Sequence, residues 1–347
     1  MKAKAFNSVL MPPAYSEVPS RDDVDLTTKF GPRELRLPII SANMKTVTGS
    51  EMAYAMYKGG GFGILHRFCT IDENVEMLND AKDCIMFPCP TGSREQDRTR
   101  KNMCGVSIGV QEEAKDRFKA LHDAGAYIIC IDVAHGHHIK VRKMIDFIRE
   151  NQKEPVTIIA GNIATSEAAI DLKEWGADIV KVGIGPGAMC ITRRNTGIGV
   201  PQLHAIQDIH DGFPDIPIIA DGGCRTVNDI ATALAAGADT VMLGSILAGT
   251  IETPGRVYPD DSTDLVNRTF YKVYGGSASA QSKGENRFVE GKMSMIPFKG
   301  HVKYILREIH QGLQSSISYR GHLNISDWKK DIEFIDIDIA GQMESES

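Results

Sequence analysis

The chain has 347 residues, of which 42% are hydrophobic, enough to bury one large core or two ordinary ones. Its 39 basic and 45 acidic side chains give a formal net charge of −6 without any Lys/Arg block, which argues against a nucleic-acid or anionic-membrane surface. Neither a leader behind the first residues nor a charge-free stretch of membrane-spanning length is evident, so we expect a cytoplasmic protein.

Short β-branched apolar runs alternate with longer amphipathic segments such as Ser166–Glu174 and Val227–Ala236. This alternation favours parallel strands joined by helical crossovers. Eight runs fit as strands, in chain order Leu37–Ala42, Phe62–His66, Gly105–Val110, Tyr127–Val133, Val156–Ala160, Ile179–Val182, Ile216–Ala220 and Thr240–Leu243. The count predicts an α/β fold, a (β/α)8 TIM barrel spanning 1–347 as a single domain.

Most of these strands end in polar or glycine-rich residues. Active sites in such barrels gather at the carboxyl ends of the strands, so we expect these residues to share one face. They are Asn43, His66-Arg67, Asp132, Gly161-Asn162, Gly183–Gly187, Asp221-Gly222-Gly223 and Gly244-Ser245.

The loop after the sixth predicted strand, Gly183–Thr192, carries Cys190 and a threonine two residues beyond it. Its three glycines and one proline forbid a regular element, which places Cys190 on a shaped loop where it would meet a ligand as a nucleophile. The alternative is a small buried thiol, because free cysteine is often buried. The seven cysteines are odd in number and scattered, which indicates reduced thiols rather than a disulfide framework.

The ends of the last two predicted strands suggest a ribose phosphate site. Barrels often bind phosphate in the loops after strands seven and eight, where the glycines of Asp221-Gly222-Gly223 and Gly244-Ser245 let backbone N–H groups approach oxygen atoms closely. The Asp221 carboxylate accepts hydrogen bonds and suits sugar hydroxyl groups. Tight turns that leave a barrel strand are the alternative for either motif alone.

Two long irregular segments follow different patterns. Residues 250–299 are rich in glycine, serine and charge, so we expect either a lid over the site, with Tyr274–Gly276, Ser277–Ser279 and Glu290–Lys292 as contacts, or disorder. Phe87–Lys101 indicates an exposed insertion. A final helix is predicted over Val302–Leu313, followed by a frayed tail at Met343–Ser347.

Many of these motifs, in this order, resemble GMP reductases and, more distantly, IMP dehydrogenases. The resemblance runs from Phe6 to about Ile337 and rests on Lys181–Thr192, Thr196–Leu203, Ile40–Met44, His66–Phe68, Ile131–Gly136, Ala220–Gly223, Met242–Gly249, Val289–Lys292 and Leu313–Tyr319. It implies a barrel enzyme of purine nucleotide metabolism.

Three features favour the reductase over the dehydrogenase. Only Cys69–Cys104 fills the interval where dehydrogenases of this family carry an inserted regulatory domain pair. Arg193–Thr196 departs from the dehydrogenase pattern after the cysteine loop, and Arg287-Phe288 replaces the Arg-Tyr pair that activates water. Phenylalanine has no proton to exchange.

For a reductase, the resemblance implies NADPH-dependent reductive deamination of GMP to IMP through a covalent Cys190 thioimidate, with ammonia released. A thiolate attacks an electron-poor ring carbon well, and covalent capture divides one difficult displacement into easier steps. Thr192 and Glu290 would relay the proton to the leaving amine. Arg67 stands where many relatives have lysine; it would stabilise charge but is a poor proton shuttle.

The resemblance also implies three ligand sets and a homotetramer. The GMP contacts would be Asp221, Gly222, Gly223, Gly244, Ser245, Gly276, Ser277, Ala278, Arg287, Glu290 and Gly291. The NADPH wall, partly from a neighbouring subunit, would comprise Ser20, Arg21, Phe68, Asp132, Val133, Ala134, Gly185, Pro186, Asn286, Arg287, Ser315, Ser316, Ile317 and Ser318. A potassium ion would be held by the carbonyl oxygens of Gly185, Gly187 and Cys190, with Arg193 nearby.

Three alternatives remain open from the residues. The first is an IMP dehydrogenase without the regulatory domain pair. The second is a purine nucleotide-binding barrel that has lost catalysis, against which Cys190, Thr192 and Glu290 argue. The third is a flavin-dependent barrel oxidoreductase, in which the cysteine loop would have no task.

Overall fold

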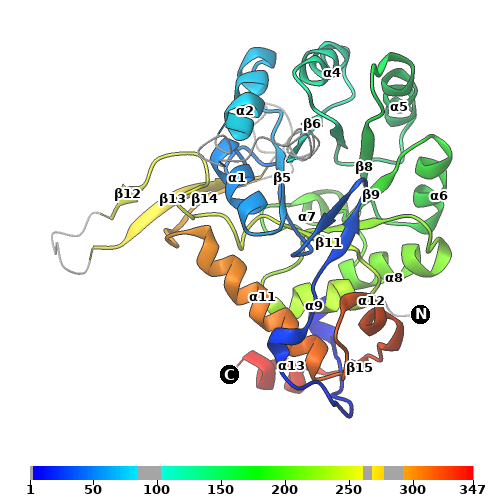
Figure 1. Cartoon of the computed structure of the whole chain (residues 1–347), viewed down its shortest axis with the longest axis vertical. Coiled ribbons are helices and arrows are strands. Elements are labelled where there is room, and N and C mark those ends of the chain that lie inside the picture. The colour runs from blue at the N-terminus through cyan, green and yellow to red at the C-terminus, as the bar shows by residue number, and fades with distance from the viewer. Residues whose placement is uncertain (1–2, 84–102, 261–267, 277–291, 347) are drawn as a thin grey trace.

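A computed structural model describes residues 3–83, 103–260, 268–276 and 292–346 (Figure 1). Eight parallel strands close into a barrel in the order β10-β11-β4-β5-β6-β7-β8-β9. Their bounds are β4 Ile39–Ser41, β5 Phe62–Leu65, β6 Cys104–Ile108, β7 Ile128–Asp132, β8 Thr157–Ile163, β9 Ile179–Val182, β10 Ile218–Asp221 and β11 Thr240–Leu243. The predicted TIM barrel is therefore confirmed.

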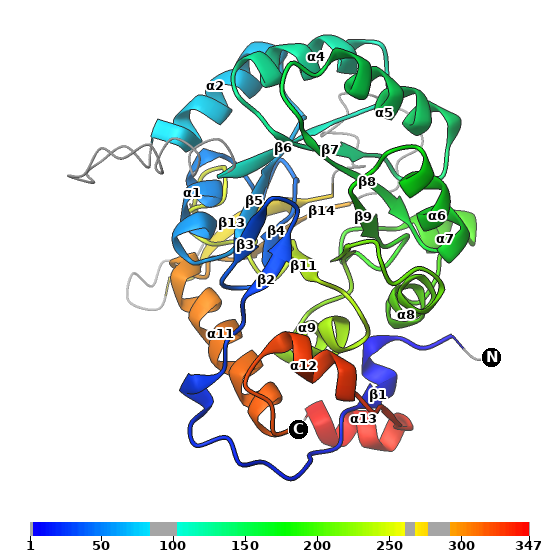
Figure 2. The same ribbon diagram turned by 45° about the vertical axis from the view of Figure 1, so that its right-hand side comes forward.

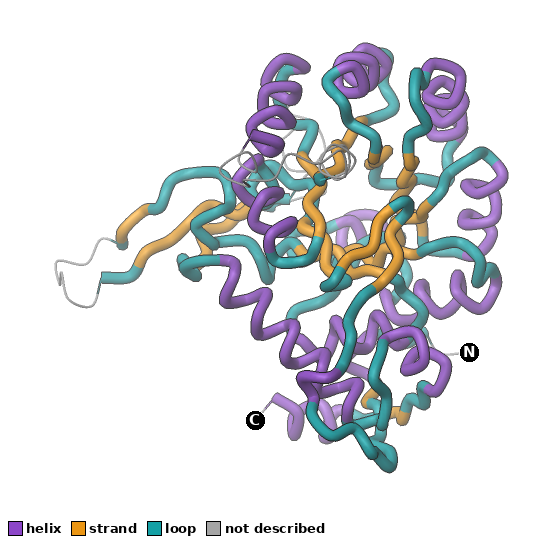
Figure 3. The backbone as a smooth tube through the Cα atoms, in the orientation of Figure 1, coloured by secondary structure: helices purple, strands orange, loops and turns teal. Residues whose placement is uncertain are grey.

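Helices surround the strands on the outside of the barrel, as the tube view in Figure 3 shows. The helices have the bounds α1 Ser50–Lys58, α2 Ile71–Asp83, α4 Glu113–Asp123, α5 Ile139–Asn151, α6 Ser166–Glu174, α7 Thr192–Thr196, α8 Gln202–Gly212, α9 Val227–Ala235, α11 Val302–Ser318, α12 Ile325–Trp328 and α13 Ile339–Glu346. None of the helices in the described ranges combines the length and apolarity needed to cross a membrane.

Smaller elements close the ends of the barrel and extend from it. They are the 3-10 turns η1 Phe6–Ser8, η2 Arg21–Asp23 and η3 Lys329–Asp331, the pairs β1 Val9–Leu10 with β15 Ile335–Asp336 and β2 Thr28–Phe30 with β3 Arg33–Leu35, and the antiparallel sheet β12 Tyr258–Pro259, β13 Phe270–Gly275 and β14 Met293–Pro297. In Figure 1 the β12–β14 sheet projects from one side of the barrel.

Alternating side chains of each strand build two apolar layers. In β7, Ile128 and Cys130 belong to the cluster that fills the barrel, whereas Ile129 and Ile131 pack in the larger cluster between strands and helices. This follows from the two-residue period of a strand. The short β2–β3 hairpin adds Phe30 to the inner cluster and lies across the barrel in Figure 2.

A partly exposed ion pair, Arg149 with Asp178, lies at the amino ends of β8 and β9. Asp178, just before β9, accepts hydrogen bonds from the Ile158 N–H and from Arg149 of α5, each at 2.7 Å. Arg149 also donates to the carbonyl of Val156 at 2.8 Å. These contacts hold the barrel at the end opposite the polar strand ends.

Four segments differ from the sequence-based expectations. Strand β8 continues past Ala160 to Ile163, because glycine at 161 allows the Lys181 backbone to approach within 2.4 Å of where a Cβ would stand. The described part of 250–299 contains a paired sheet rather than an irregular loop. Helix α11 extends to Ser318, and the tail through Glu346 is helical. Phe87–Lys101 lies outside the described residues.

We predict that Phe30→Ala will lower the free energy of unfolding by about 3–5 kcal/mol, because it leaves a void beside the Phe62 ring. The two ring centroids lie 5.0 Å apart, and Phe30 is 1% exposed. Urea unfolding measures the change. A loss below about 1 kcal/mol would mean that the hairpin does not contribute to the inner core.

Candidate active site

A cleft opens to solvent where the loops after β9, β10 and β11 meet. Parallel neighbours in register bring these loops together, since Ala220 pairs with Val182 and Asp221 with Met242. The lining residues are Ala42, Met44, Pro186, Gly187, Ala188, Asp221, Gly222, Gly223, Cys224, Arg225, Met242, Gly244, Ser245 and Tyr274. Five of the predicted GMP contacts thus share one cleft.

The turn after β10 needs its glycines for close approach. Gly222 has φ +87°, and a Cβ there would stand 3.1 Å from the backbone nitrogen of Gly187. A side chain at position 222 would therefore be strained and would push the cysteine loop away. The absence of side chains leaves backbone N–H groups accessible along this wall of the cleft.

The loop after β11 forms the facing wall. Ala248 donates its N–H to the carbonyl of Gly244 at 2.8 Å, which closes one helical turn beginning at Gly244 and Ser245. The first N–H groups of such a turn have no acceptor within it. The buried ring of Tyr274 from β13 covers this wall, because its hydroxyl lies 3.0 Å from where a Gly244 Cβ would stand. Tyr274 is one of the predicted contacts of the 250–299 segment.

Cys190 is a half-buried free thiol beside the cleft. Its Sγ donates to the Thr192 Oγ1 at 3.1 Å, and its backbone N–H donates to the carbonyl of Gly187 at 2.9 Å. A Cβ on Gly187, which lines the cleft, would lie 3.5 Å from the Cys190 Cβ. The sulfur is therefore neither sealed in the core nor remote from the cleft.

Four other described cysteines are unsuited to nucleophilic chemistry. Burial raises the pKa of Cys104 and of Cys130 to about 12, and that of Cys224 well above its usual value. Burial also raises the pKa of Cys69. Because the thiolate is the reactive form, raised pKa values make these thiols inert at neutral pH.

A buried ion cluster at the strand ends was not anticipated from the sequence. Lys181 of β9 is 1% exposed, and its Nζ donates to Asp132 Oδ1 and Asp221 Oδ2, each at 2.8 Å. It also donates to Asn162, whose own Nδ2 donates to Asp221 at 2.9 Å. In the sequence, Lys181 is an apparent interruption of an apolar strand, and no spacing connects it to its partners.

The opposite charges within this cluster outweigh burial and keep Lys181 and Asp132 ionised. Burial works against a charged Lys181, but Asp132 and Asp221 raise its pKa above the usual value. Burial likewise works against a charged Asp132, yet the Lys181 and Arg67 cations keep its pKa below the usual value. The lysine and the aspartate are therefore both ionised at neutral pH.

Arg67 and Phe68 lie together at the end of β5. The Arg67 guanidinium lies 5.0 Å from the centroid of the Phe68 ring and donates to the carbonyl of Asp132 at 3.3 Å. The structure thus brings these three predicted residues to one place, next to the ion cluster. A fixed cation with an aromatic face suits a charged, planar ligand.

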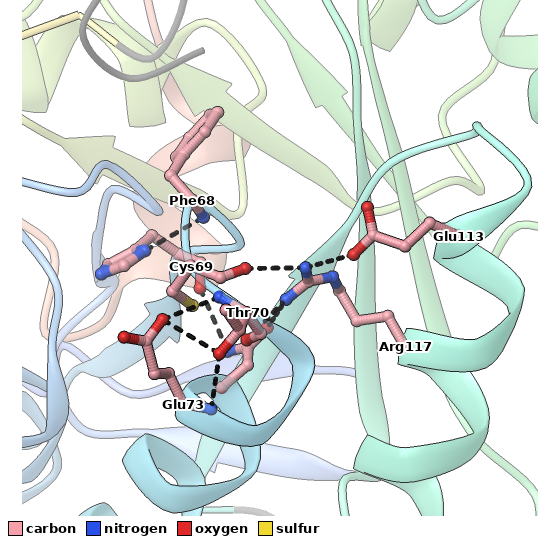
Figure 4. A network of polar contacts seen from close by, with 8 residues as sticks. Phe68, Cys69, Thr70, Glu73, Glu113 and Arg117 are labelled. Carbon is pink, nitrogen blue, oxygen red and sulfur yellow. Dashed lines mark hydrogen bonds and ion pairs between the residues drawn. The ribbon is translucent and has the colours of Figure 1, made fainter. Parts of the chain in front are cut away.

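Arg117 of α4 holds that loop in place and was also missed by the sequence analysis, since it resembles a charge on a solvated helix face. Its guanidinium donates to the carbonyl of Cys69 at 2.8 Å, a contact drawn in Figure 4. It also donates to the side chain of Asn74 at 2.9 Å. Asn74 in turn donates to the carbonyl of His66 at 3.1 Å. The network fixes the backbone on both sides of Arg67.

A second set of predicted cofactor residues lies elsewhere on the molecule. Arg21 donates to the Ser315 hydroxyl at 3.0 Å, which joins η2 to the last turn of α11. Ser20, Ser316, Ile317 and Ser318 belong to the same two segments. In Figures 1 and 2 the end of α11 lies in the lower half of the molecule, whereas α2, which packs against β5, lies in the upper half.

The base of the 277–291 segment is anchored beside Cys190. The Lys292 N–H donates to the carbonyl of Met189 at 3.1 Å, and the Gly276 N–H donates to the carbonyl of Lys292 at 3.0 Å. Ser277, Ala278, Asn286, Arg287, Glu290 and Gly291 lie outside the described residues. The two residues that flank this segment, Gly276 and Lys292, lie next to the cysteine loop.

Arg193 occupies the inside of the loop predicted to bind potassium. Its Cγ lies 2.5 Å from where a Gly185 Cβ would stand, and its guanidinium donates to the carbonyl oxygens of Ile184 and Val200. Loop carbonyl oxygens are ligands that suit K⁺. The positive charge of Arg193 beside Gly185, however, repels a second cation at this position.

Comparisons of the sequence with known proteins identify a family and several similar proteins. Residues 3–347 match the family described as IMP dehydrogenase / GMP reductase domain. A protein of Leptothrix cholodnii named GMP reductase is 40% identical over 333 residues, covering 94% of this chain and 93% of the relative. Proteins of the same name from Acidovorax ebreus and Streptococcus gordonii are each 39% identical, over 94% and 91% of this chain and 93% and 90% of their own lengths.

We predict that His66 makes stability depend on acid pH. Burial, with help from the Lys45 and Arg117 cations, lowers its pKa from 6.5 to about 4, and its neutral Nδ1 accepts the Phe68 N–H at 3.2 Å. Because the unfolded chain binds the proton more readily, this contribution is complete above pH 6.5 and is lost as pH falls towards 4. The loss should be on the order of 3 kcal/mol.

Urea unfolding across that pH range measures the loss, with His66→Asn as the comparison, since its side-chain oxygen can still accept the Phe68 N–H. The wild-type free energy of unfolding should fall more steeply than that of the variant. Parallel curves would contradict this role for His66.

Proposed function

The chain belongs to the family of IMP dehydrogenases and GMP reductases, and from that premise we propose that it is a GMP reductase, an NADPH-dependent oxidoreductase that converts GMP to IMP and ammonia. The observation that carries the proposal is the half-buried Cys190 thiol, hydrogen-bonded to Thr192 beside a glycine-walled cleft. Family membership argues against the flavin-dependent alternative.

Sequence features favour the reductase over IMP oxidation. Water activation in the dehydrogenases needs an Arg-Tyr pair, and this chain has Phe288 after Arg287, which cannot exchange a proton. The similar proteins reported above carry the name GMP reductase, and this chain matches them over nearly their whole lengths. An IMP dehydrogenase without the regulatory domain pair stays the second candidate.

In the proposed first step, the Cys190 thiolate attacks C2 of the guanine ring. The C2–S bond forms, the C2–N bond breaks, and the amine leaves as ammonia after taking a proton. Thr192, whose hydroxyl lies 3.1 Å from the sulfur, and Glu290 relay protons at this point. The product of the step is a thioimidate on Cys190.

NADPH, when bound, supplies the hydride that reduces the purine at C2; the C2–S bond then breaks, which frees IMP and the thiolate. The Phe68 ring and the Asp132–Ala134 segment would form a wall against the nicotinamide beside Arg67, and Gly185 and Pro186 would belong to the same wall. Arg67 stabilises charge near this wall. The choice of NADPH over NADH rests on the resemblance.

GMP is held mainly by its ribose phosphate in this proposal. Asp221 accepts hydrogen bonds from the ribose hydroxyls, while the phosphate lies between the backbone of Gly222-Gly223 and that of Gly244-Ser245. Ala188 lines the same cleft without a hydroxyl to donate, which leaves phosphate binding to the backbone and Ser245.

The second cofactor set, Ser20, Arg21 and Ser315–Ser318, would serve a neighbouring subunit, because η2 and the end of α11 lie in the lower half of Figures 1 and 2, whereas α2, which follows Phe68 in the chain, lies in the upper half. This placement is what the predicted homotetramer requires. The tetramer, the cytoplasmic location and a potassium ion on Gly185, Gly187 and Cys190 stay predictions.

We predict that the protein will oxidise NADPH when GMP is present. The loss of absorbance of the reduced nicotinamide measures this reaction. The same protein with IMP and NAD should give no reduced nicotinamide. Turnover of only the second mixture would replace the reductase by the dehydrogenase, and turnover of neither would support a non-catalytic binding barrel.

We further predict that Cys190→Ser will lower kcat at least about a thousandfold while IMP binding stays within about threefold, since a hydroxyl is a far weaker nucleophile at neutral pH. Steady-state kinetics and calorimetry with IMP measure the two effects. Cys104→Ala, which removes a buried thiol at the amino end of β6, is the matched control and should keep turnover. Retention of turnover by Cys190→Ser would rule out the covalent step.

A further inference from the structure

Lys181 contacts side chains from three other strands, and together with its own strand these are four consecutive strands of the barrel. In sheet order, β7 supplies Asp132, β8 supplies Asn162 and β10 supplies Asp221, while Lys181 stands on β9 between them. All three partners lie at or near the carboxyl ends of their strands. One ammonium group thus connects the carboxyl ends of four of the eight barrel strands.

Stability alone gives little reason for this arrangement. Burying charged groups costs desolvation energy, and replacing buried ion pairs by apolar side chains is often neutral or stabilising. Lys181 is 1% exposed, in a strand whose other residues are buried and apolar. What the cluster provides is a fixed position for its carboxylates.

The lysine has no freedom to shift. The backbone and Cβ of Lys181 lie within 2.4 and 2.7 Å of where a Gly161 Cβ would stand, so β8 packs directly on it. Asn162 is itself held by its hydrogen bond to the Gly183 carbonyl at 2.8 Å. Movement of either carboxylate away from Lys181 would cost the buried ammonium one of its two charged partners.

The two carboxylates belong to different ligand sites. Asp221 lines the cleft that would hold the nucleotide ribose, and the contacts from Lys181 and Asn162 both reach its Oδ2, which leaves Oδ1 for a ribose hydroxyl. Asp132 lies beside Arg67 in the wall that would face the nicotinamide. Lys181 lies 2.8 Å from both.

We propose that Lys181 is a positioning residue that sets the place of the nucleotide ribose and of the nicotinamide relative to one another by holding Asp221 and Asp132 on a single ammonium group. The inference rests on the proposed function for the identity of the two ligands. It extends that function, because it makes one buried side chain responsible for the alignment across which hydride is transferred.

The test uses Lys181→Met and Lys181→Arg in the full-length protein. Calorimetry with IMP and fluorescence titration with NADPH give the two dissociation constants, and steady-state kinetics give kcat. Lys181→Met should weaken both ligands on the order of tenfold, because both carboxylates lose a charge-assisted hydrogen bond. It should also lower kcat. Lys181→Arg, which keeps the charge, should restore both affinities to within about threefold while kcat stays reduced.

Arg149→Met is the matched control, since it removes a cation that binds an aspartate and strand carbonyls at the opposite end of β8 and β9. It should lower the unfolding temperature without changing either dissociation constant. If Lys181→Met does not fold, Lys181→Met in an Asp132→Asn background replaces it. Compared with Asp132→Asn alone, that double variant should bind IMP on the order of tenfold more weakly.

The outcomes separate the two claims. A wild-type protein that does not turn over GMP with NADPH refutes the proposed function. An active wild type whose Lys181→Met variant loses thermal stability but keeps both affinities and kcat, as Arg149→Met does, refutes only the positioning role. Loss of affinity for one ligand alone also overturns it.

Discussion

Closing eight parallel strands into one barrel is the constraint on which the rest of the structure depends. Because neighbouring strands run the same way and in register, residues distant in the chain meet at one rim, as Ala220 does with Val182 and Asp221 with Met242. Every loop that forms the cleft leaves a strand at that rim. At the amino ends of the strands, by contrast, the Arg149–Asp178 ion pair has a structural role.

At that rim the chain divides its tasks between backbone and side chains. Glycines after β10 and β11 offer backbone groups to an anion, whereas the Lys181 cluster and Arg67 beside it offer charged side chains. Cys190 stands on the loop after β9, beside Gly187 of the cleft, and the Lys292 N–H binds the Met189 carbonyl of the same loop. The proposed reaction needs a nucleotide site, a thiol and a nicotinamide site close to one another.

Local patterns were sufficient to predict the strands, because β-branched runs and the glycine signals after them are encoded in consecutive residues. The same glycine pattern identified the loop of Cys190. The β12–β14 sheet was not predicted, since 250–299 is dominated by turn residues and its strands pair across a long gap in sequence. Lys181 was missed for a similar reason: its partners Asp132 and Asp221 are 49 and 40 residues away, and only barrel closure brings them together.

In the proposed mechanism Cys190 forms a covalent bond to the purine, and mass spectrometry of the peptide that contains Cys190 detects this bond directly. The protein is mixed with GMP without NADPH, quenched in acid and digested. The account predicts that the peptide containing Cys190 gains the mass of GMP less ammonia, and that added NADPH removes this adduct. An enzyme that converts GMP while this peptide keeps its unmodified mass under both conditions would contradict the account.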